Sequence, residues 1–190
     1  MNLEEYHELE RTSTMKYEYA DGQVYAMSGG TFEHSAIAVN LSTALRTHLR
    51  GKSCRVANSD MKVLPLGGEN PSYYPDITVT CHPEDYMRGS IAIRSPRLII
   101  EILSPSTAYR DRGEKLRVYQ ACNSVEEYAM VSSHHQEIEV YHRETEELWT
   151  FARYRHEQAV TLASVGLTIS VAEMYAETDI PLLSSMLDSD

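Results

Sequence analysis

Two acidic residues lie in segments that otherwise have the composition of buried strands. Asp76 follows Pro75 at the start of the apolar run ITVT, and Glu101 lies inside the run LIIEIL. Carboxylates are seldom buried unless they are paired or bound to a cation. When two of them approach each other at low dielectric, one takes up a proton or a cation neutralises both. Mg²⁺ prefers such oxygen ligands, so this pair is a candidate metal site.

The two carboxylates can meet only if their runs are neighbouring strands. Asp76 opens one run and Glu101 lies near the end of a later one, so antiparallel pairing would place them within a few ångströms of each other. Strand alternation predicts that Glu101 shares its face with Ile99 and Leu103. A purely structural interpretation is also open, in which Pro75-Asp76 simply begins a strand and Glu101 points outward.

The N-terminal part of the chain predicts a hairpin and a helix before these strands. Residues 17–27 alternate aromatic and polar residues around Asp21-Gly22, a pair that tolerates positive φ in a tight turn. Residues 31–50 predict a helix that ends at Gly51. Its apolar stripe recurs every four residues, at Ile37, Leu41, Leu45 and Leu49. Strands are expected at residues 54–66, 74–81 and 97–103.

The C-terminal part predicts a second helix followed by a meander. The helix is expected at residues 108–122, capped by Ser106 or Thr107. The remaining expected elements are strands at residues 127–132, 137–142, 148–154 and 160–162 and a short helix at 171–175. This order favours an α/β fold of the α+β kind, in which helices flank a mixed, mainly antiparallel sheet. We expect one domain over residues 1–180 and a loose tail over residues 181–190.

Composition narrows the class of protein. The chain of 190 residues has no apolar run long enough to span a membrane and no signal-peptide pattern at its N-terminus. Its three cysteines, Cys54, Cys81 and Cys122, form no CxxC motif. They predict neither a zinc ribbon nor a disulfide framework, and we expect the reducing environment of the cytoplasm. There is no glycine-rich phosphate loop, no GxSxG and no HExxH, so P-loop, serine-hydrolase and zincin functions have no support.

The balance of charge limits how the chain could bind nucleic acid. A formal net charge of −11 argues against broad, non-specific binding to phosphates. Basic residues nevertheless gather in two places where a local groove could form. One group lies in the second predicted helix (Arg110, Arg112, Lys115 and Arg117), and the other lies at the end of the first (Arg46, Arg50, Lys52 and Arg55).

Four ordered motifs together resemble a known family. They read DGxxYAMSGGTxxHS, YPDITV, EILSPST and DRxxKxxxY, and the resemblance extends over most of the chain, from about Tyr17 to about Val171. This set resembles the Uma-type family of restriction endonucleases found in cyanobacteria, which belongs to the PD-(D/E)XK nuclease superfamily. The resemblance implies a restriction-endonuclease-like core that hydrolyses DNA with Mg²⁺ or Mn²⁺. Asp76 and Glu101 would then be metal ligands, with the carbonyl of Ile102 as a further one.

The chain departs from the superfamily pattern at one position. Leu103 stands where the (D/E)XK element has a lysine. Two lysines could supply the ammonium from elsewhere in the chain. Lys115 shares a helix face with Asp111 and Tyr119 at i+4 spacing, whereas Lys62 lies on the strand that precedes Pro75-Asp76. The sequence does not choose between them, and either lysine could serve only as an ordinary ion-pair partner or surface residue.

Other residues could complete such a site. Glu18 matches the region from which the superfamily often draws an extra acidic ligand, although it could equally be a polar residue on the outside of the hairpin. His34 lies beside the apolar stripe of the first helix, where a histidine is more often a core residue than a ligand. His134 and His135 are adjacent and, in a strand, would face opposite ways, so they cannot chelate one ion together.

Three functions remain compatible with these residues. The first is a Mg²⁺-dependent DNA endonuclease, for which a homodimer is a natural form because two strands are cut most simply by two sites related by a two-fold axis. The second is a catalytically inactive module of the same fold that binds protein or nucleic acid, which Leu103 and the net charge favour. The third is a metal-dependent hydrolase of small phosphate esters.

Overall fold

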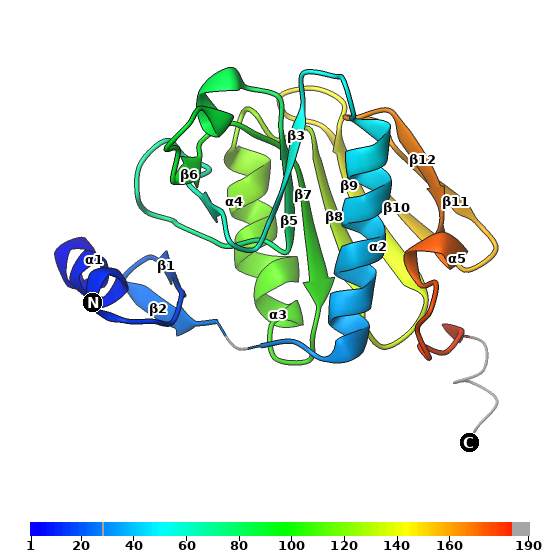
Figure 1. The fold of residues 1–190 in the computed structure, drawn as a ribbon, viewed down its shortest axis with the longest axis horizontal. Coiled ribbons are helices and arrows are strands. Elements are labelled where there is room, and N and C mark those ends of the chain that lie inside the picture. Colours follow the sequence, from blue (N-terminus) through cyan, green and yellow to red (C-terminus); the bar gives the residue numbers. More distant parts are fainter. Residues whose placement is uncertain (28, 184–190) are drawn as a thin grey trace.

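The computed structural model, which describes residues 1–27 and 29–183, confirms the α+β class. Its centre is a six-stranded sheet with helices on both faces (Figure 1). From one edge to the other, its strands are β10 (Trp149–Arg155), β9 (Glu137–Arg143), β8 (Glu127–Ser132), β7 (Pro96–Leu103), β5 (Ile77–Thr80) and β3 (Arg55–Asn58). Neighbouring strands are antiparallel, except for the parallel pair β7 and β8. The predicted mainly antiparallel sheet is therefore confirmed.

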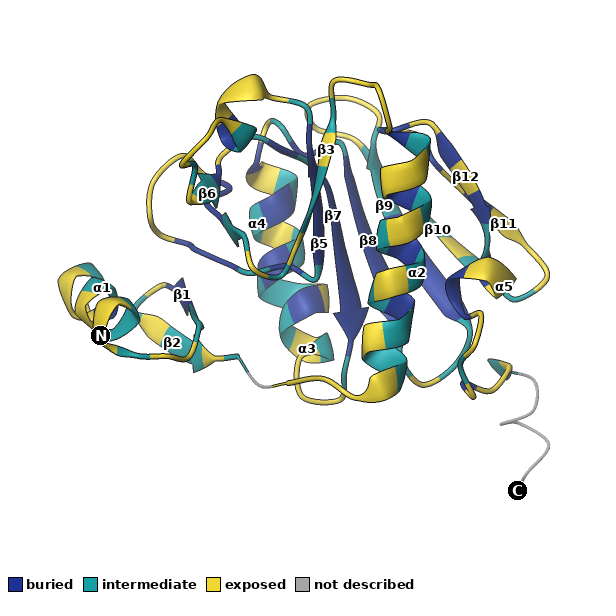
Figure 2. Ribbon diagram, in the orientation of Figure 1, coloured by how far each residue is buried: buried dark blue, intermediate teal, exposed yellow. Residues whose placement is uncertain are grey.

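Strand β7 divides the core into two layers, as alternation predicts. Ile100 and Ile102 face a cluster that also buries Ile37 and Leu41 of helix α2 (Phe32–His48). Residue Ile99 faces the opposite cluster. That second cluster lies under a helical segment made of α3 (Ala108–Arg110), a π-helical turn (Asp111–Lys115) and α4 (Leu116–Ala121). Helix α2 and the α3–α4 segment thus cover opposite faces of the sheet (Figures 1 and 2).

The α3–α4 segment connects two parallel strands. Parallel neighbours cannot be joined by a tight turn, so the chain must cross over the face of the sheet, usually as a helix. Here the crossover leaves the C-terminal end of β7 and returns to the start of β8. Its first turns therefore lie next to the end of β7, where Glu101 is found.

An N-terminal unit lies beside this core (Figure 1). It consists of helix α1 (Leu3–Thr12) and the hairpin of β1 (Tyr17–Ala20) and β2 (Gln23–Ala26). The predicted turn is confirmed, with φ of 48° at Asp21 and 80° at Gly22. Tyr19 and Ser72 exchange two backbone hydrogen bonds, which attach the hairpin to the segment before β5. The sequence did not predict α1, whose capping box is formed by Asn2 and Glu5.

Two predicted strands have different bounds from those expected. The run at residues 54–66 breaks after β3, because the side chain of Asn58 accepts a hydrogen bond from the backbone N–H of Asp60 and closes a turn. The chain resumes as β4 (Lys62–Val63), which pairs with β6 (Ala92–Ile93). The strand expected at 160–162 is β11 (Ala159–Leu162), and it pairs with an unpredicted strand, β12 (Leu167–Ser170). The short elements η1 (Pro83–Tyr86) and α5 (Val171–Met174) complete the fold.

The expectation that the cysteines form no disulfide was wrong. Cys54 and Cys81 form a disulfide, with their Cα atoms 3.9 Å apart. The antiparallel register of β3 and β5 pairs Arg55 with Thr80 and so places the two flanking cysteines opposite each other. This pairing across 27 residues left no signal in the sequence. Cys122 is free and buried.

Two further expectations concern a membrane span and the C-terminal tail. No helix of the described residues is long and apolar enough to cross a membrane. Of the predicted loose tail, residues 184–190 lie outside the part of the chain that the structure describes.

Candidate active site

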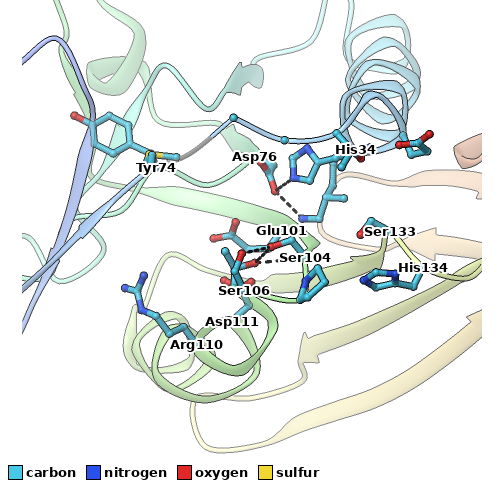
Figure 3. Close-up of a pocket in the computed structure, with 18 of the residues that line it drawn as sticks. His34, Tyr74, Asp76, Glu101, Ser104, Ser106, Arg110, Asp111, Ser133 and His134 are labelled. Carbon is cyan, nitrogen blue, oxygen red and sulfur yellow. Dashed lines mark hydrogen bonds and ion pairs between the residues drawn. The ribbon is translucent and has the colours of Figure 1, made fainter.

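The predicted meeting of the two carboxylates rests on strand pairing that the structure contains. Strands β5 and β7 are antiparallel, with Ile77 opposite Ile100, so Asp76 at the entrance to β5 lies across from Glu101. Both residues line a pocket of about 810 Å³ between α2, the hairpin and the start of the α3–α4 segment. Figure 3 shows Asp76 beside His34 and Glu101 between Asp76 and the helical segment that carries Arg110 and Asp111.

Lys115 is the central cation of this pocket. Its Nζ lies 2.9 Å from Glu101 Oε1, 2.9 Å from Glu18 Oε1 and 3.4 Å from Asp111 Oδ1. The lysine is 5% exposed, and the three carboxylates are equally buried. Asp111 and Lys115 are the first and last residues of the π-helical turn, and the predicted i+4 pairing of their side chains is present. The crossover thus delivers to Glu101 the ammonium that Leu103 cannot provide.

Burial and ion pairing together set the ionisation of these groups. Burial alone would lower the pKa of Lys115, but the charges of Glu101, Glu18 and Asp111 raise it well above its ordinary value. Burial raises the pKa of Glu101 well above its ordinary value despite the opposing effect of Lys115. Burial likewise raises the pKa of Asp111. Glu101 therefore has a strong tendency to take up either a proton or a second cation.

Glu18 is held as a carboxylate by several donors. Burial alone would raise its pKa, but the ammonium of Lys115, the backbone N–H of Tyr74 and the guanidinium of Arg110 together lower it. The Tyr74 N–H donates to Glu18 Oε1 over 3.1 Å, and Arg110 donates to Oε2 over 3.0 Å. The hairpin residue is therefore part of the pocket and does not face solvent.

Asp76 is positioned by two donors. The backbone N–H of Ile102 donates to Asp76 Oδ2 over 2.7 Å, and His34 Nε2 lies 3.3 Å from the same oxygen. The hydrogen bond with Asp76 raises the pKa of His34, although burial opposes it, and a hydrogen bond to the backbone of Ile102 adds to the rise. His34 therefore lines the site and contacts both the aspartate and the residue after Glu101 (Figure 3).

The guanidinium of Arg110 joins the hairpin to the helical segment. It pairs with Glu18, lies 3.4 Å from Glu114 Oε1 and stacks on the ring of Tyr25 at 3.3 Å from the centroid. The hydroxyl of Tyr73 donates to Glu114 over 2.9 Å. Sequence analysis did not identify Tyr25 or Glu114 as residues of the site. The only signal was that both lie within the family-like motifs.

The second candidate lysine is elsewhere. Lys62 pairs with Glu10 of α1, and its Nζ lies 5.4 Å from the centre of the Tyr6 ring and 5.9 Å from that of Tyr74. It does not line the pocket. The structure therefore brings Lys115, and not Lys62, to the two carboxylates.

The adjacent histidines lie in the turn between β8 and β9, and not in a strand, but they still have different surroundings. His134 lines the pocket together with Ser133, whereas His135 lies 3.5 Å from Glu137 outside it. Hydroxyl groups also gather at this end of the pocket: Ser104 Oγ lies 3.0 Å from Ser106 Oγ and 3.1 Å from Thr107 Oγ1.

The donor set fits a hard divalent cation held by few protein ligands. Across residues 1–27 and 29–183, no group of three or more His, Cys, Asp or Glu side chains is arranged to hold a metal. Asp76 and Glu101 nevertheless provide two carboxylates on adjoining strands, and the charge of Asp76 contributes to the raised pKa of Glu101. Mg²⁺ commonly takes one or two carboxylates and fills its other positions with water and substrate phosphate. A cation here would relieve the repulsion between the two residues.

Comparison with known proteins gives concordant matches. A family model described as "Uma2: Putative restriction endonuclease" matches residues 3–172, which confirms the family resemblance of the motifs. Two proteins of Synechocystis sp. (strain ATCC 27184 / PCC 6803 / Kazusa) are similar. "Uncharacterized protein slr1290" is 40% identical over 92% of this chain and 91% of its own length. "Uncharacterized protein sll1609" is 26% identical over 82% of this chain and 88% of its own.

A solved structure shares the fold. It is the crystal structure of "a putative nuclease belonging to DUF820 from Anabaena variabilis ATCC 29413". It superposes with a TM-score of 0.75 at 18% sequence identity and covers 93% of this chain and 98% of its own. The predicted nuclease-like fold is therefore confirmed.

Proposed function

The chain belongs to the Uma2 family, and from this premise we propose that residues 1–180 form one nuclease domain that hydrolyses phosphodiester bonds of DNA with Mg²⁺ or Mn²⁺. The observation that carries this proposal is the position of Lys115. Its ammonium lies 2.9 Å from both Glu18 and Glu101, on the face of β7 that a lysine at position 103 would share. A helical lysine thus stands in for the missing residue of the (D/E)XK element.

Each group has a defined part in this proposal. Asp76 and Glu101 would hold the metal, with the Ile102 carbonyl as a further ligand. When bound, the ion would lower the pKa of a water ligand and neutralise charge on the phosphate. Lys115 would orient the attacking water and stabilise negative charge on the phosphate in the transition state. Glu18 would keep Lys115 charged and in place, or orient water.

Ile102 and His34 would then hold the side chain of Asp76 in position. The Ile102 N–H and His34 both contact Asp76 Oδ2, so the other carboxylate oxygen would be the one that binds the metal. Holding a ligand within a fraction of an ångström of its working position is a large part of what a metal site requires of the protein.

A second candidate function is binding without cleavage. It is favoured by Leu103 and by the net charge of −11, and also by the ion pair that Lys115 already makes with Glu101 Oε1. In such a module the lysine would serve only to neutralise buried carboxylates and preserve the fold.

Metal binding and cleavage distinguish the two functions. Calorimetry with Mn²⁺ should show binding to the wild type that is lost in Asp76→Asn and Glu101→Gln, which keep the size of each side chain. DNA cleavage should be lost in the same variants and in Lys115→Met, but retained in Lys62→Met. Wild-type protein that binds no metal and cuts no DNA would contradict the nuclease proposal and leave the binding module.

Whether the substrate is single-stranded or double-stranded determines whether a dimer would be useful. If the substrate is a duplex, a homodimer with two sites would cut both strands in one encounter. Light scattering on the purified protein, with and without a duplex oligonucleotide, tests this part of the proposal.

A further inference from the structure

The reactive groups lie in a recess. Glu18 and Glu101 are each 4% exposed, and Lys115 is 5% exposed. The walls of the recess come from the hairpin, α2 and the α3–α4 segment. A duplex is a stiff rod whose stacked bases hold its phosphates in two fixed helical tracks. An unpaired strand can bend sharply and direct a single phosphate into such a recess.

Two exposed aromatic residues, which do not themselves line the recess, lie within one or two positions of residues that do. Phe32 is 76% exposed and Tyr109 is 90% exposed, whereas rings of this size are usually covered. Phe32 lies between Thr31 and Glu33, which both line the pocket. Figure 1 shows that the start of α2 and helix α3, which carry these rings, lie at the same end of the molecule. Within the part of the chain that the structure describes, neither ring stacks on another side chain.

Tyr109 belongs to α3, at the start of the helical segment that borders the pocket. Thr107 and Arg110, which come before and after it in the chain, line the pocket, while its own ring is exposed to solvent. A fold has no use of its own for a large ring that buries almost nothing. Base stacking on an aromatic side chain, by contrast, is a major source of affinity in proteins that bind single strands, and it works with any base.

The charges favour stacking over phosphate contacts. The pocket is lined by six carboxylates, from Glu18, Glu33, Asp76, Glu101, Asp111 and Asp179, against Lys115 and Arg110. Arg112, which could have extended a basic track from the helix, pairs with Glu139 at 3.2 Å. Proteins that bind duplexes through phosphates rely on counterion release from several Lys and Arg contacts. This surface offers few, so the bases must contribute more of the affinity.

We propose that the substrate is an unpaired strand of DNA, whose bases stack on Phe32 and Tyr109 at the two sides of the pocket while the phosphate between them reaches Lys115. This inference rests on the proposed function and specifies its substrate. A single protomer suffices to cut one strand, so cleavage of such a substrate needs no dimer.

The experiment compares a fluorescently labelled single strand of about 20 nucleotides with the duplex of the same sequence. Anisotropy in EDTA measures binding without cleavage. We expect the wild type to prefer the single strand, with a shallow dependence on salt. Phe32→Ala and Tyr109→Ala should each weaken binding of the single strand by about 5- to 100-fold. Phe32→Tyr and Tyr109→Phe, which keep a ring, should bind like the wild type.

Ile91→Ala is the matched control, because Ile91 is 87% exposed and does not line the pocket. It should leave binding unchanged. Equal affinity for single strand and duplex, or alanine variants that bind the single strand like the wild type, would overturn the inference.

Cleavage of the same two substrates with Mn²⁺ tests the proposed function separately. Glu101→Gln should bind the single strand but not cut it. A wild type that cuts duplex as well as single strand, with no effect of the alanine variants, would retain the nuclease and refute the stacking. A wild type that binds the single strand through the two rings but cuts nothing would retain the stacking and refute the nuclease.

Discussion

Replacing Lys115 with methionine removes the one cation that three buried carboxylates share. Methionine keeps the length and apolar stem of the side chain, so the change is mainly in charge. Glu18 retains Arg110 as a partner, but no other Lys or Arg among the described residues makes an ion pair with Glu101. Removing one partner from a buried ion pair costs about 3–5 kcal/mol. For a chain of this size that corresponds to a fall in Tm of about 10 °C.

Proton uptake by Glu101 reduces that cost. Its pKa is already raised by burial, and losing the ammonium raises it further. The stability that such a carboxyl group contributes is fully present below its ordinary, unfolded pKa of 4.5, and it is lost as pH rises from there through the raised folded pKa. The difference in unfolding free energy between the wild type and Lys115→Met should therefore be smaller at acid pH and increase towards neutral pH.

Urea unfolding followed by circular dichroism measures this difference. Lys62→Met is the control, because Lys62 makes a single partly exposed ion pair, with Glu10, and should lose about 1 kcal/mol or less. Adding Glu101→Gln to Lys115→Met should recover about 1–3 kcal/mol, since the uncompensated charge is then gone. Equal losses for the two lysine variants, or a double variant no more stable than Lys115→Met, would refute the account of Lys115 as the buried counter-charge.

Three further predictions concern other features. Leu103→Lys, added to Lys115→Met, should restore part of the Mn²⁺-dependent cleavage, because residue 103 lies on the same face of β7 as Glu101. Cleavage no higher than in Lys115→Met alone would argue that a lysine at position 103 cannot place its ammonium where that of Lys115 lies. Reducing the Cys54–Cys81 disulfide should lower the unfolding free energy by about 3.5 kcal/mol, the value expected for a loop of 27 residues. Unfolding with and without dithiothreitol measures this loss, and a Cys54→Ser/Cys81→Ser variant should not respond to the reductant. Burial would raise the pKa of Glu137, but the hydrogen bond to Arg155 and the charge of Arg153 lower it, so the stability that Glu137 contributes is present above about pH 4.5 and lost as pH falls. Glu137→Gln should flatten this part of the pH–stability profile, and an unchanged profile would contradict this role of Glu137.

Local patterns predicted most of the elements. The period of two in LIIEIL correctly placed Glu101 on the face opposite Ile100, and the i+4 stripe correctly predicted α2. Helix α1 was not predicted because it is short and polar and buries one residue, Tyr6, so it has no apolar stripe. The break after β3 depended on a single side-chain hydrogen bond from Asp60 to Asn58, which a pattern of apolar residues does not register.

The site was predictable where strand pairing determined it, and not where long-range packing did. Antiparallel pairing of two neighbouring strands was enough to expect Asp76 beside Glu101. The choice between Lys62 and Lys115 depended on where the crossover and α1 pack. The residues nearby in the sequence do not predict this packing. The stacking of Arg110 on Tyr25 joins segments 85 positions apart in the same way.

The order in which the site residues occur along the chain has a consequence for synthesis. Glu18 leaves the ribosome first, and the crossover that carries Lys115 onto Glu101 is closed when β8 pairs with β7. At about 10 residues per second, roughly ten seconds of translation separate the first carboxylate from the completion of β8. During that interval the nascent chain carries carboxylates but no assembled ammonium. If the chain cuts DNA as proposed, its site would therefore be incomplete until the central sheet has formed.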